Sequence, residues 1–490
     1  MRPAIELDLP LAVDRMADQP LHAQIAGGLR SAAVEGLLTA GTRLPSSRTL
    51  ATRLGVARGT VLAAYEQLEG EGQLERRHGS GVYLADNLKP QPLPPKLSTV
   101  PSSGQAVAGF HRSQQPGLDL RPGQPNTRQL IDPAWRRAWK EAAACLPPTA
   151  PERQGLLALR QQISAHLAAA RGLACEPSQV FVTAGTDDAL SLLVHALELA
   201  GKPVAVEDPG YPSARQLLAR LGAHVIPVPV DADGLVLDRL VEVQQPARLV
   251  LVTPSHQYPL GGRLPLHRRL SLLAWAHQHD VIVAEDDYDG EFRYDVAPLP
   301  ALASLDSAGR VVHLGTFSKS LTPWLRTGFL VAPPWLAGAL LDVREDLGSP
   351  VDGVTQSALA AYMATGALRR HIARTRRDYA RARQRLTELL AAHAPLVTLG
   401  GLDAGLHAVL DLPPGTDTEA LTRQLAAEGV TVADLSEYAV ADAIARDRPA
   451  LVIGYGNASP LQLEHAVRLV MRSLRSDRPG TQRGAPQACK

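Results

Sequence analysis

The chain has 490 residues, of which 45% are hydrophobic and 20% charged, and this excludes a lone binding module and a globally disordered protein. The 50 Lys and Arg residues against 49 Asp and Glu residues leave a net charge of +1, so any contact with nucleic acid has to be local. The three cysteines, Cys145, Cys175 and Cys489, argue against a disulfide framework and a thiolate zinc site, and we expect no metal.

The N-terminal residues lack the pattern of a targeting sequence. Residues 1–20 carry acidic side chains early and have no continuous apolar core, unlike a signal peptide. No stretch approaches the ~20 apolar residues that a membrane-spanning helix needs. We therefore expect a soluble, cytoplasmic protein with no membrane partner.

The first predicted elements are three helices and a hairpin. A first helix is expected from about residue 20 to 36, because apolar residues recur there every four positions. Two further helices, over 48–54 and 57–71, are separated by a tight turn at Gly55, the spacing of a helix-turn-helix unit. Residues 73–85 alternate around a Gly-Ser-Gly turn and predict a β-hairpin that would form a wing. The face of the first helix is formed by Leu21, Ile25, Leu29, Ala33 and Leu37.

A Pro-rich segment follows and sets the domain boundaries. Residues 87–116 combine Pro with Ser, Gln and Gly, a composition that favours a semi-rigid linker over a packed core. The expected organisation is a first domain over 15–86, a linker over 87–116, a large domain over 117–477 and a mobile tail over 478–490.

The large domain shows short apolar runs that alternate with helix-length segments such as 266–280. This alternation predicts a doubly wound, mainly parallel sheet, so the chain as a whole is a multidomain α/β protein. A helix over 379–392 and the alternating segments LHAVLDL and ALVIGYG predict a smaller subdomain over 379–477, after a larger part over 117–378. The predicted strands are 179–183, 204–206, 249–252, 281–284 and 311–314.

Polar residues follow these strands, at the sheet edge where ligands of open α/β sheets bind. Gly185, Thr186 and Asp187 open a helix and offer backbone N–H groups to an anion such as a phosphate. The other strands lead into residues 207–211, 253–259, 285–289 and 315–319, and Asp286 and Lys319 end two neighbouring strands. A lysine, a carboxylate, and cationic and hydroxyl groups are what pyridoxal phosphate (PLP) requires.

Segments of the chain resemble two known protein families. The winged helix-turn-helix of GntR-type repressors resembles the segment LPSSRTLATRLGVARGTVLAAYEQLEGEGQLERRHGSGVYLA. The fold-type I, PLP-dependent aminotransferases resemble the segments TPSHQYPLGG, EDDYDGEFRY and GTFSKSLTPWLRTGF. Both families in one chain, in this order, resemble the MocR subfamily of transcriptional regulators.

The resemblance implies roles for individual residues. Lys319 would form the Schiff base with PLP, Asp286 would pair with the pyridinium nitrogen, and Tyr288 would hydrogen-bond the 3′-oxygen. Tyr211 would stack on the ring, and His256 would lie in the same site. The phosphate would be held by Thr316, Ser318 and Arg326 together with the backbone of Gly185, Thr186 and Asp187. The residues expected to contact DNA are Arg48, Arg58, Thr60, His78 and Gly79.

Two positions depart from the family pattern. Asp187 stands where the family usually has Gln, which places a carboxylate near the phosphate. Val452 stands where aminotransferases usually have the Arg that binds the substrate α-carboxylate, with Arg446 and Arg448 in the preceding loop. Catalytic turnover is therefore uncertain, and we expect no efficient transamination.

We interpret the chain as a PLP-binding, sequence-specific DNA-binding regulator whose aminotransferase-like domain senses a small molecule, either PLP itself or an amine or amino compound. The resemblance further implies a head-to-tail homodimer. Two alternatives remain open. One is an active PLP-dependent aminotransferase with an accessory DNA-binding domain, and the other is a repressor whose PLP-like fold binds a different ligand.

Overall fold

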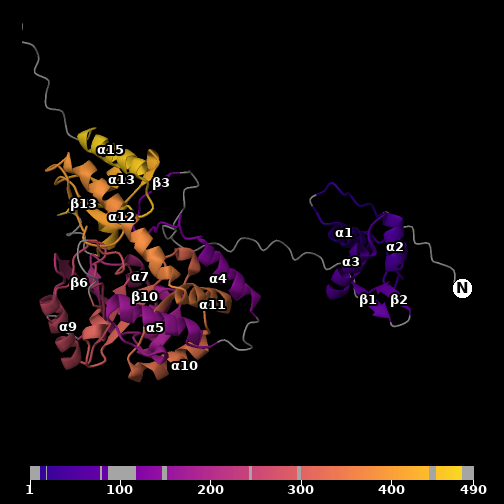
Figure 1. Ribbon diagram of the computed structural model, residues 1–490, viewed down its shortest axis with the longest axis horizontal. Coiled ribbons are helices and arrows are strands. Elements are labelled where there is room, and N and C mark those ends of the chain that lie inside the picture. Colours follow the sequence, from indigo (N-terminus) through magenta and orange to yellow (C-terminus); the bar gives the residue numbers. More distant parts are fainter. Residues whose placement is uncertain are drawn as a thin grey trace, which may run out of the picture. The chain divides into compact units, whose positions relative to one another are not determined.

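The computed structural model describes residues 11–17, 19–77, 80–85, 117–145, 152–241, 246–294, 300–440 and 448–476 (Figure 1). The chain divides into two compact units, residues 1–112 and 113–490. Within the described ranges, no helix is long and apolar enough to cross a membrane. The expected linker, the expected tail, His78, Gly79 and Arg446 lie outside the described residues.

The N-terminal unit consists of three helices and an antiparallel hairpin, as the sequence predicts. Ser46 begins the second helix, because its side chain accepts a hydrogen bond from Thr49 N at 3.1 Å. Gly55, with a φ of 63°, ends that helix in the left-handed conformation that favours glycine. The elements are α1 Leu21–Val34, α2 Ser47–Leu54, α3 Arg58–Gly70, β1 Leu74–Arg77 and β2 Gly81–Leu84.

The core of this unit lies between α1, α2 and α3. Ile25 and Leu29 of α1 pack there with Tyr65 of α3, whose hydroxyl donates to Pro45 O at 2.8 Å. The expected position of Leu37 on the α1 face is wrong. The helix ends at Val34 and the chain turns at Gly36, where φ is 75°, so Leu37 lies beyond the helix and is 59% exposed.

The C-terminal unit is built on an eight-stranded sheet of order β4-β11-β10-β9-β8-β5-β6-β7. The strands β10, β9, β8, β5 and β6 are parallel, which confirms the mainly parallel sheet. Sequence reasoning missed β6 and also β11, which is antiparallel to both of its neighbours. The bounds are β4 Val180–Thr183, β5 Pro203–Asp208, β6 His224–Asp231, β7 Gly234–Leu235, β8 Leu249–Val252, β9 Ile282–Asp287, β10 Val311–Thr316 and β11 Gly328–Val331.

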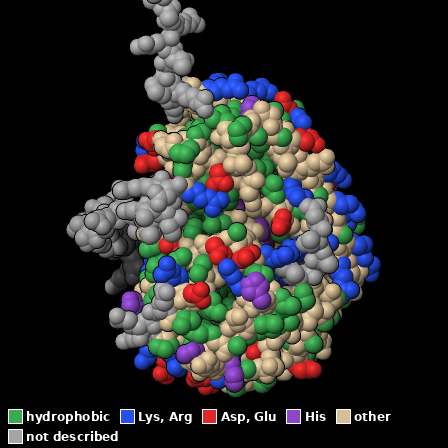
Figure 2. Space-filling model, turned by 90° about the vertical axis from the view of Figure 1, so that its left-hand side faces the viewer, with side chains coloured by type: hydrophobic (Ala, Val, Ile, Leu, Met, Phe, Trp, Pro, Cys, Tyr) green, Lys and Arg blue, Asp and Glu red, His purple; other side chains and the backbone are tan. Residues whose placement is uncertain are grey.

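Helices cover both faces of this sheet (Figure 1). Along β8, Leu249 packs on the side of α6, α7 and α10, whereas the next residue, Val250, packs on the side of α9. Both faces are therefore apolar, as expected for buried parallel strands. The helices are α4 Pro133–Ala144, α5 Leu157–Arg171, α6 Thr186–Ala196, α7 Pro212–Arg220, α8 Leu237–Val241, α9 Leu266–Gln278, α10 Ala337–Leu347 and α11 Gly353–Ala364. Figure 2 shows basic and acidic side chains interspersed over one face of the unit.

A smaller sheet of order β12-β13-β16-β15 forms the last part of the unit. Helix α12 spans Ala367–Ala391, so the expected helix start at Tyr379 is wrong, and a subdomain boundary at residue 378 would fall inside one helix. Strand β3 (Leu118–Asp119) pairs in parallel with β14 (Val430–Thr431), which fixes the first described residues of the unit to its last part. The remaining elements are β12 Thr398–Gly400, β13 His407–Asp411, α13 Thr418–Ala427, β15 Ala433–Asp434, β16 Ala450–Gly454 and α15 Pro460–Ser476.

Candidate cofactor-binding site

A cavity of about 180 Å³ lies beyond the carboxyl ends of β4, β9 and β10. All residues that the sequence assigns to a cofactor line it, with the exception of His256. Sequence reasoning missed three further lining residues, Thr253, Tyr258 and Pro323. The lining residues are Gly185, Thr186, Asp187, Tyr211, Thr253, Tyr258, Asp286, Tyr288, Thr316, Ser318, Lys319, Pro323 and Arg326.

Lys319 follows β10, directly beside the strand that carries Asp286. Its Nζ donates a hydrogen bond to Gly123 O at 3.0 Å. Burial lowers the pKa of Lys319, which the negative charges of Asp289 and Asp286 oppose, so the amine loses its proton more readily than an exposed lysine. A Cβ at Gly123, where φ is 90°, would lie 2.6 Å from Nζ, so this position leaves no room for a side chain.

Asp286 faces the cavity from β9 and is 5% exposed. Within the described residues, its Oδ1 has no hydrogen-bond partner. Burial, followed by the neighbouring charge of Asp287, raises the pKa of Asp286 to about 7. An unpaired buried carboxylate is costly, so this site fits a ligand that brings a protonated ring nitrogen, such as PLP.

The opposite end of the cavity combines a helix N-terminus with hydroxyl groups and an arginine. Gly185, with a φ of 101°, precedes α6, whose first N–H groups are available to an anion. Thr316 Oγ1 and Ser318 Oγ lie 2.9 Å apart, and Arg326 lines the same end. Asp187 is the exception, because its Oδ1 is buried without a partner among the described residues. This end fits a phosphate apart from that carboxylate.

The neighbouring acidic residue has a structural role instead. Asp188 accepts a hydrogen bond from Ala184 N at 3.0 Å and forms an ion pair with Arg344 at 2.9 Å. Asp188 therefore binds the backbone that leads into α6, and Asp187 is left facing the cavity.

His256 lies behind the cavity wall rather than in it. Its Nδ1 is 2.8 Å from Asp289 Oδ2 and 2.9 Å from the Tyr288 hydroxyl. Its Nε2 is buried and has no partner among the described residues. Donor atoms of His256, Asp289 and His407 lie within 4.8 Å of one another. The His407 Nε2 is 3.0 Å from Pro259 O, and burial lowers the pKa of His407 to about 3, so this ring is neutral.

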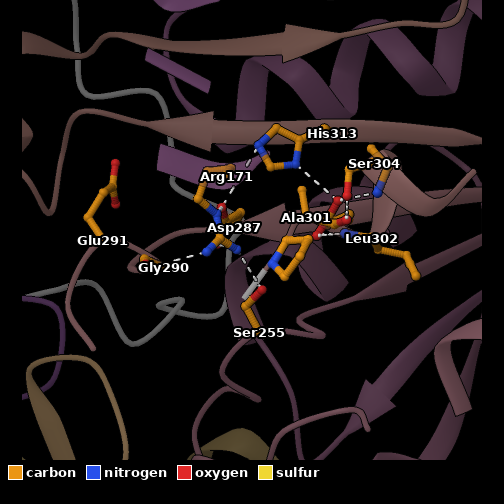
Figure 3. A network of polar contacts seen from close by, with 12 residues as sticks. Arg171, Ser255, Asp287, Gly290, Glu291, Ala301, Leu302, Ser304 and His313 are labelled. Atoms are coloured by element: carbon orange, nitrogen blue, oxygen red, sulfur yellow. Dashed lines mark hydrogen bonds and ion pairs between the residues drawn. The ribbon is translucent and has the colours of Figure 1, made fainter. Parts of the chain in front are cut away.

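Glu285 and Asp287 alternate with Asp286 along β9 and so point to its other face, where both have partners. Figure 3 shows Asp287 beside Arg171. Asp287 Oδ2 accepts from Arg171 Nε at 2.6 Å, and Arg171 also donates to Ser255 Oγ at 2.7 Å. Glu285 lies 3.0 Å from His313 Nδ1 and accepts from Leu302 N at 2.7 Å. Burial alone would raise the pKa of Glu285, but His313 and these N–H groups outweigh it and hold the pKa at about 2.

Sequence reasoning missed Arg171 and His313. The available signal was a charged or titratable side chain within apolar surroundings, as for His313 in the run VVHLG. Such residues are buried only when they have a partner.

Val452 lies in β16 and is completely buried. It packs with Val409 and Tyr438, in an apolar cluster that Tyr258 of the cavity wall also contacts. Arg448 does not point into the cavity, since its Nε donates to Asp411 Oδ1 at 2.8 Å on the surface. Arg448 therefore does not replace the missing carboxylate-binding group at position 452.

In the N-terminal unit, the described residues expected to contact DNA lie at the starts of two helices. Arg48 is the second residue of α2 and Arg58 the first of α3, and both are exposed. Arg58 Nε donates to Ser47 Oγ at 3.3 Å, and Thr60 is half-buried. Two guanidinium groups are thus available on the helix-turn-helix, where phosphates or base edges could accept from them.

Two family models match the chain. The model described as aminotransferase class I and II matches residues 116–468, and that of the bacterial regulatory proteins of the gntR family matches residues 21–84. The HTH-type pyridoxine biosynthesis transcriptional regulator PdxR of Corynebacterium glutamicum is 43% identical over 88% of this chain and 91% of its own. The probable rhizopine catabolism regulatory protein MocR of Rhizobium meliloti is 35% identical over 95% of each chain.

Solved structures resemble the C-terminal unit. An archaeal alanine:glyoxylate aminotransferase matches with a TM-score of 0.69 and 24% identity, over 74% of this chain and 92% of its own. The α-aminoadipate aminotransferase LysN of Thermus thermophilus, complexed with N-(5′-phosphopyridoxyl)-L-leucine, has a TM-score of 0.65 and 26% identity, over 74% of this chain and 92% of its own. The predicted fold-type I aminotransferase fold is confirmed.

Proposed function

Because this chain belongs to the MocR subfamily of GntR-type transcriptional regulators, we propose that PLP bound at Lys319 controls how its N-terminal unit binds operator DNA. The observation that carries the proposal is that Lys319 and Asp286 line the same cavity. Asp286 is a buried carboxylate whose Oδ1 has no partner in the described part of the chain, and Lys319 is an amine whose pKa is lowered mainly by burial. Few ligands other than PLP need both groups together.

When bound, PLP supplies an aldehyde that reacts with a lysine amine. The chain provides the rest of the chemistry. Lys319 acts as the nucleophile, because burial favours its neutral form. Asp286 would accept a hydrogen bond from the ring N–H, which would give its unpartnered oxygen a donor. The N–H groups at the start of α6, with Thr316, Ser318 and Arg326, would hold the phosphate, and Tyr211 would cover the ring.

We propose PLP itself as the effector, rather than an α-amino acid. A carboxylate in a low-dielectric pocket needs a charged hydrogen-bond donor, and leaving it unpaired costs several kcal/mol. Position 452 offers a buried valine instead, and Arg448 is held by Asp411. The pyridoxine biosynthesis regulator of Corynebacterium glutamicum, whose name links it to vitamin B6, supports the same choice.

A working aminotransferase is the second candidate, and the complete lysine and carboxylate pair of the cavity favours it. To separate the two, the PLP-loaded protein is mixed with a panel of amino acids and amines, and its absorbance spectrum is followed. Rapid conversion to the pyridoxamine form by α-amino acids would establish the enzyme and contradict our reading of Val452. An unchanged spectrum supports the regulator.

We also propose that the protein acts as a head-to-tail homodimer. Beside the cavity, Trp324 is 80% and Ile131 is 60% exposed, and both line an adjoining groove with Leu130 and Leu325. Large exposed apolar patches commonly mark protein interfaces. Sedimentation of the full chain tests this, with Trp324→Glu expected to shift the protein toward monomer.

The test of the main proposal uses the full chain and the variant Lys319→Ala. The wild-type protein should show the visible absorbance band of lysine-bound PLP and retain the cofactor after borohydride reduction, and its operator affinity should change when PLP is added. Lys319→Ala should fold, lose the band and lose the PLP response. An unchanged band in the variant, or operator binding that ignores PLP in the wild type, would refute the proposal.

A further inference from the structure

His256 and Asp289 lie buried behind Tyr288, and the proposed function gives neither of them a role. His256 is 2% and Asp289 1% exposed, so both side chains are shielded from water. The His256 Nδ1 lies 2.8 Å from Asp289 Oδ2 and 2.9 Å from the Tyr288 hydroxyl. The His256 and Tyr288 rings are stacked at 26° with centroids 6.0 Å apart. The His256 Nδ1 therefore faces both the Asp289 carboxylate and the Tyr288 hydroxyl. Whether Nδ1 carries a proton determines which of these two oxygens donates and which accepts.

The surroundings determine which His256 nitrogen carries the proton. Asp289 as a carboxylate can only accept, so a bare Nδ1 would place two lone pairs 2.8 Å apart. The alternative tautomer would also leave an N–H at Nε2, which is buried and has no partner among the described residues. An unsatisfied buried donor costs about 1–3 kcal/mol. His256 is therefore protonated at Nδ1 and donates to Asp289.

This tautomer fixes the role of Tyr288. Because Nδ1 already carries a proton, the tyrosine hydroxyl cannot donate to it. Burial, followed by the negative charge of Asp289, holds the pKa of Tyr288 well above its ordinary value, so the hydroxyl keeps its proton. That proton has two acceptors within reach, the Asp289 carboxylate or an oxygen of a ligand in the cavity. Donation from His256 to Asp289 makes the carboxylate a weaker competitor.

Close packing holds the group in this arrangement. Gly405, with a φ of 78°, lies so near that an added Cβ would be 2.4 Å from Asp289 Oδ2 and 2.5 Å from His256 Cε1. The carbonyl of Gly405 in turn accepts a hydrogen bond from the Tyr455 hydroxyl at 3.0 Å. Neither side chain has room to turn away, so the orientation of the His256 ring is set by the fold.

We propose that His256 and Asp289 are positioning residues that turn the Tyr288 hydroxyl into the cavity as a hydrogen-bond donor, and so select a ligand with an acceptor oxygen beside its lysine-reactive carbon. This rests on the proposed function, since PLP has such an oxygen at its ring position 3. The pair acts through Tyr288 and does not line the cavity itself.

The test compares the Kd values of PLP and 3-deoxypyridoxal phosphate, which lacks this oxygen, by absorbance titration of the full chain. Both ligands carry the aldehyde, so the ratio isolates the contact to the oxygen. We expect wild type to prefer PLP by about tenfold or more, as for a hydrogen bond to a charged group. In His256→Phe, Asp289 loses its donor and takes the tyrosine proton, so the preference should fall toward that of Tyr288→Phe.

A conservative variant separates positioning from packing. His256→Gln keeps an N–H that can reach Asp289, so it should retain more of the preference than His256→Phe. In the Tyr288→Phe background, His256→Phe should have no further effect on the ratio. The matched control is His166→Phe, which removes another buried histidine, 3.3 Å from Glu291 and outside the cavity lining, and should leave the ratio unchanged.

The outcomes are distinct. A wild-type ratio in folded His256→Phe overturns the inference while the PLP site stands. If thermal unfolding shows that His256→Phe does not fold, Asp289→Asn decides: a neutral amide no longer holds the proton at His256 Nδ1, so this nitrogen can accept from Tyr288 and the preference should fall. An unchanged ratio there overturns the inference equally. If the wild type binds neither ligand, the proposed function fails first and the inference fails with it.

Discussion

The two faces of strand β9 treat the same kind of side chain in opposite ways. On one face, Glu285 is buried and the Asp287 side chain is 6% exposed, and their oxygens accept from Arg171, from His313 and from backbone N–H groups. On the other face, Asp286 is equally buried, yet one of its oxygens has no partner within the described chain. Successive residues of a strand point to opposite faces, so neighbours in the run EDD are separated by the sheet itself.

The difference shows how a structural acid can be told from one that awaits a ligand. A paired buried charge stabilises a single arrangement, whereas an unpaired one remains a cost until something binds. The pKa values separate Glu285, at about 2, from Asp286, at about 7, whereas burial still raises the pKa of Asp287 despite its partner Arg171. Burial acts on Glu285 and Asp286 alike, and the partners account for the divergence.

Breaking the engaged face should have the largest effect. Arg171→Met keeps much of the side-chain volume but leaves Asp287 buried beside His313 without its main partner. Loss of one member of a buried ion pair costs about 3–5 kcal/mol. Chemical denaturation of the full chain should show a loss of this size. A loss below 1 kcal/mol would mean that water replaces the guanidinium and that the two faces differ less than we argue.

Removing the charge of Asp286, on the opposite face of β9, should instead stabilise the ligand-free protein. The folded-state pKa of Asp286 is raised from 3.8 to about 7, so the ligand-free folded protein holds this proton more tightly than the unfolded chain. The resulting penalty is absent below pH 4, grows between pH 4 and 7, and is complete above pH 7. Asp286→Asn without PLP should therefore be about 2–4 kcal/mol more stable than wild type at pH 8 and similar at pH 4.

The same variant should bind PLP more weakly, because an amide cannot hold the ring proton as a carboxylate does. Thermal unfolding at the two pH values and absorbance titration at pH 8 measure the two effects. If Asp286→Asn raises the stability of the ligand-free protein and lowers its affinity for PLP, the role of Asp286 is to bind the ligand. A loss of both would place it with Glu285 and Asp287 as a structural acid.

Exposed arginines at helix starts extend the comparison to the N-terminal unit. Among the described residues, Arg58 donates one hydrogen bond, to Ser47 Oγ at 3.3 Å, and the guanidinium group has further donors for a ligand. Arg58→Ala should weaken operator binding by about 1–3 kcal/mol and relax base discrimination if the contact is bidentate to guanine. Fluorescence anisotropy with operator and scrambled DNA measures both. Equal operator binding by the isolated C-terminal unit would contradict this location.

The smallest effect is expected at a surface pair. Arg448 and Asp411 are 2.8 Å apart, but their side chains are 43% and 29% exposed, so water competes for both. Arg448→Ala should cost less than about 1 kcal/mol of stability and leave PLP binding unchanged. If Arg448→Ala instead abolished a reaction with amino acids, this arginine would be the carboxylate-binding group that position 452 lacks.

Much of the fold could be predicted because its signals are local. The period of apolar residues predicts the helices of the N-terminal unit, and short apolar runs predict β8, β9 and β10. Strand β11 was missed because it follows the Lys319 segment after a turn and has no helix-length connection, so nothing local marks it as a partner of β4. The start of α12 was missed although Leu368, Ile372 and Tyr379 are buried at helical spacing, because arginines fill most of the positions between them.

The candidate site could be predicted in part for the same reason. Polar residues at strand ends meet at one edge of a parallel sheet, so Asp286 and Lys319 were found. Tyr258 was not selected, because nothing local shows that its ring turns into the cavity. Likewise, the partners Arg171 and Asp287 are 116 positions apart, and only the folded chain brings them together.

The hydrogen bond between Lys319 and Gly123 couples the cavity to the rest of the polypeptide. Gly123 lies seven residues after position 116, from which the chain leads back to the DNA-binding unit. Leu118 N is anchored to Gly429 O at 2.8 Å, while Gly123 O accepts from the Lys319 amine, which would change on reacting with a ligand. An amine joined to a ligand carbon no longer offers the same N–H to this carbonyl. Reaction of Lys319 with a ligand would therefore change the hydrogen bond at one end of the segment that Leu118 anchors at its other end.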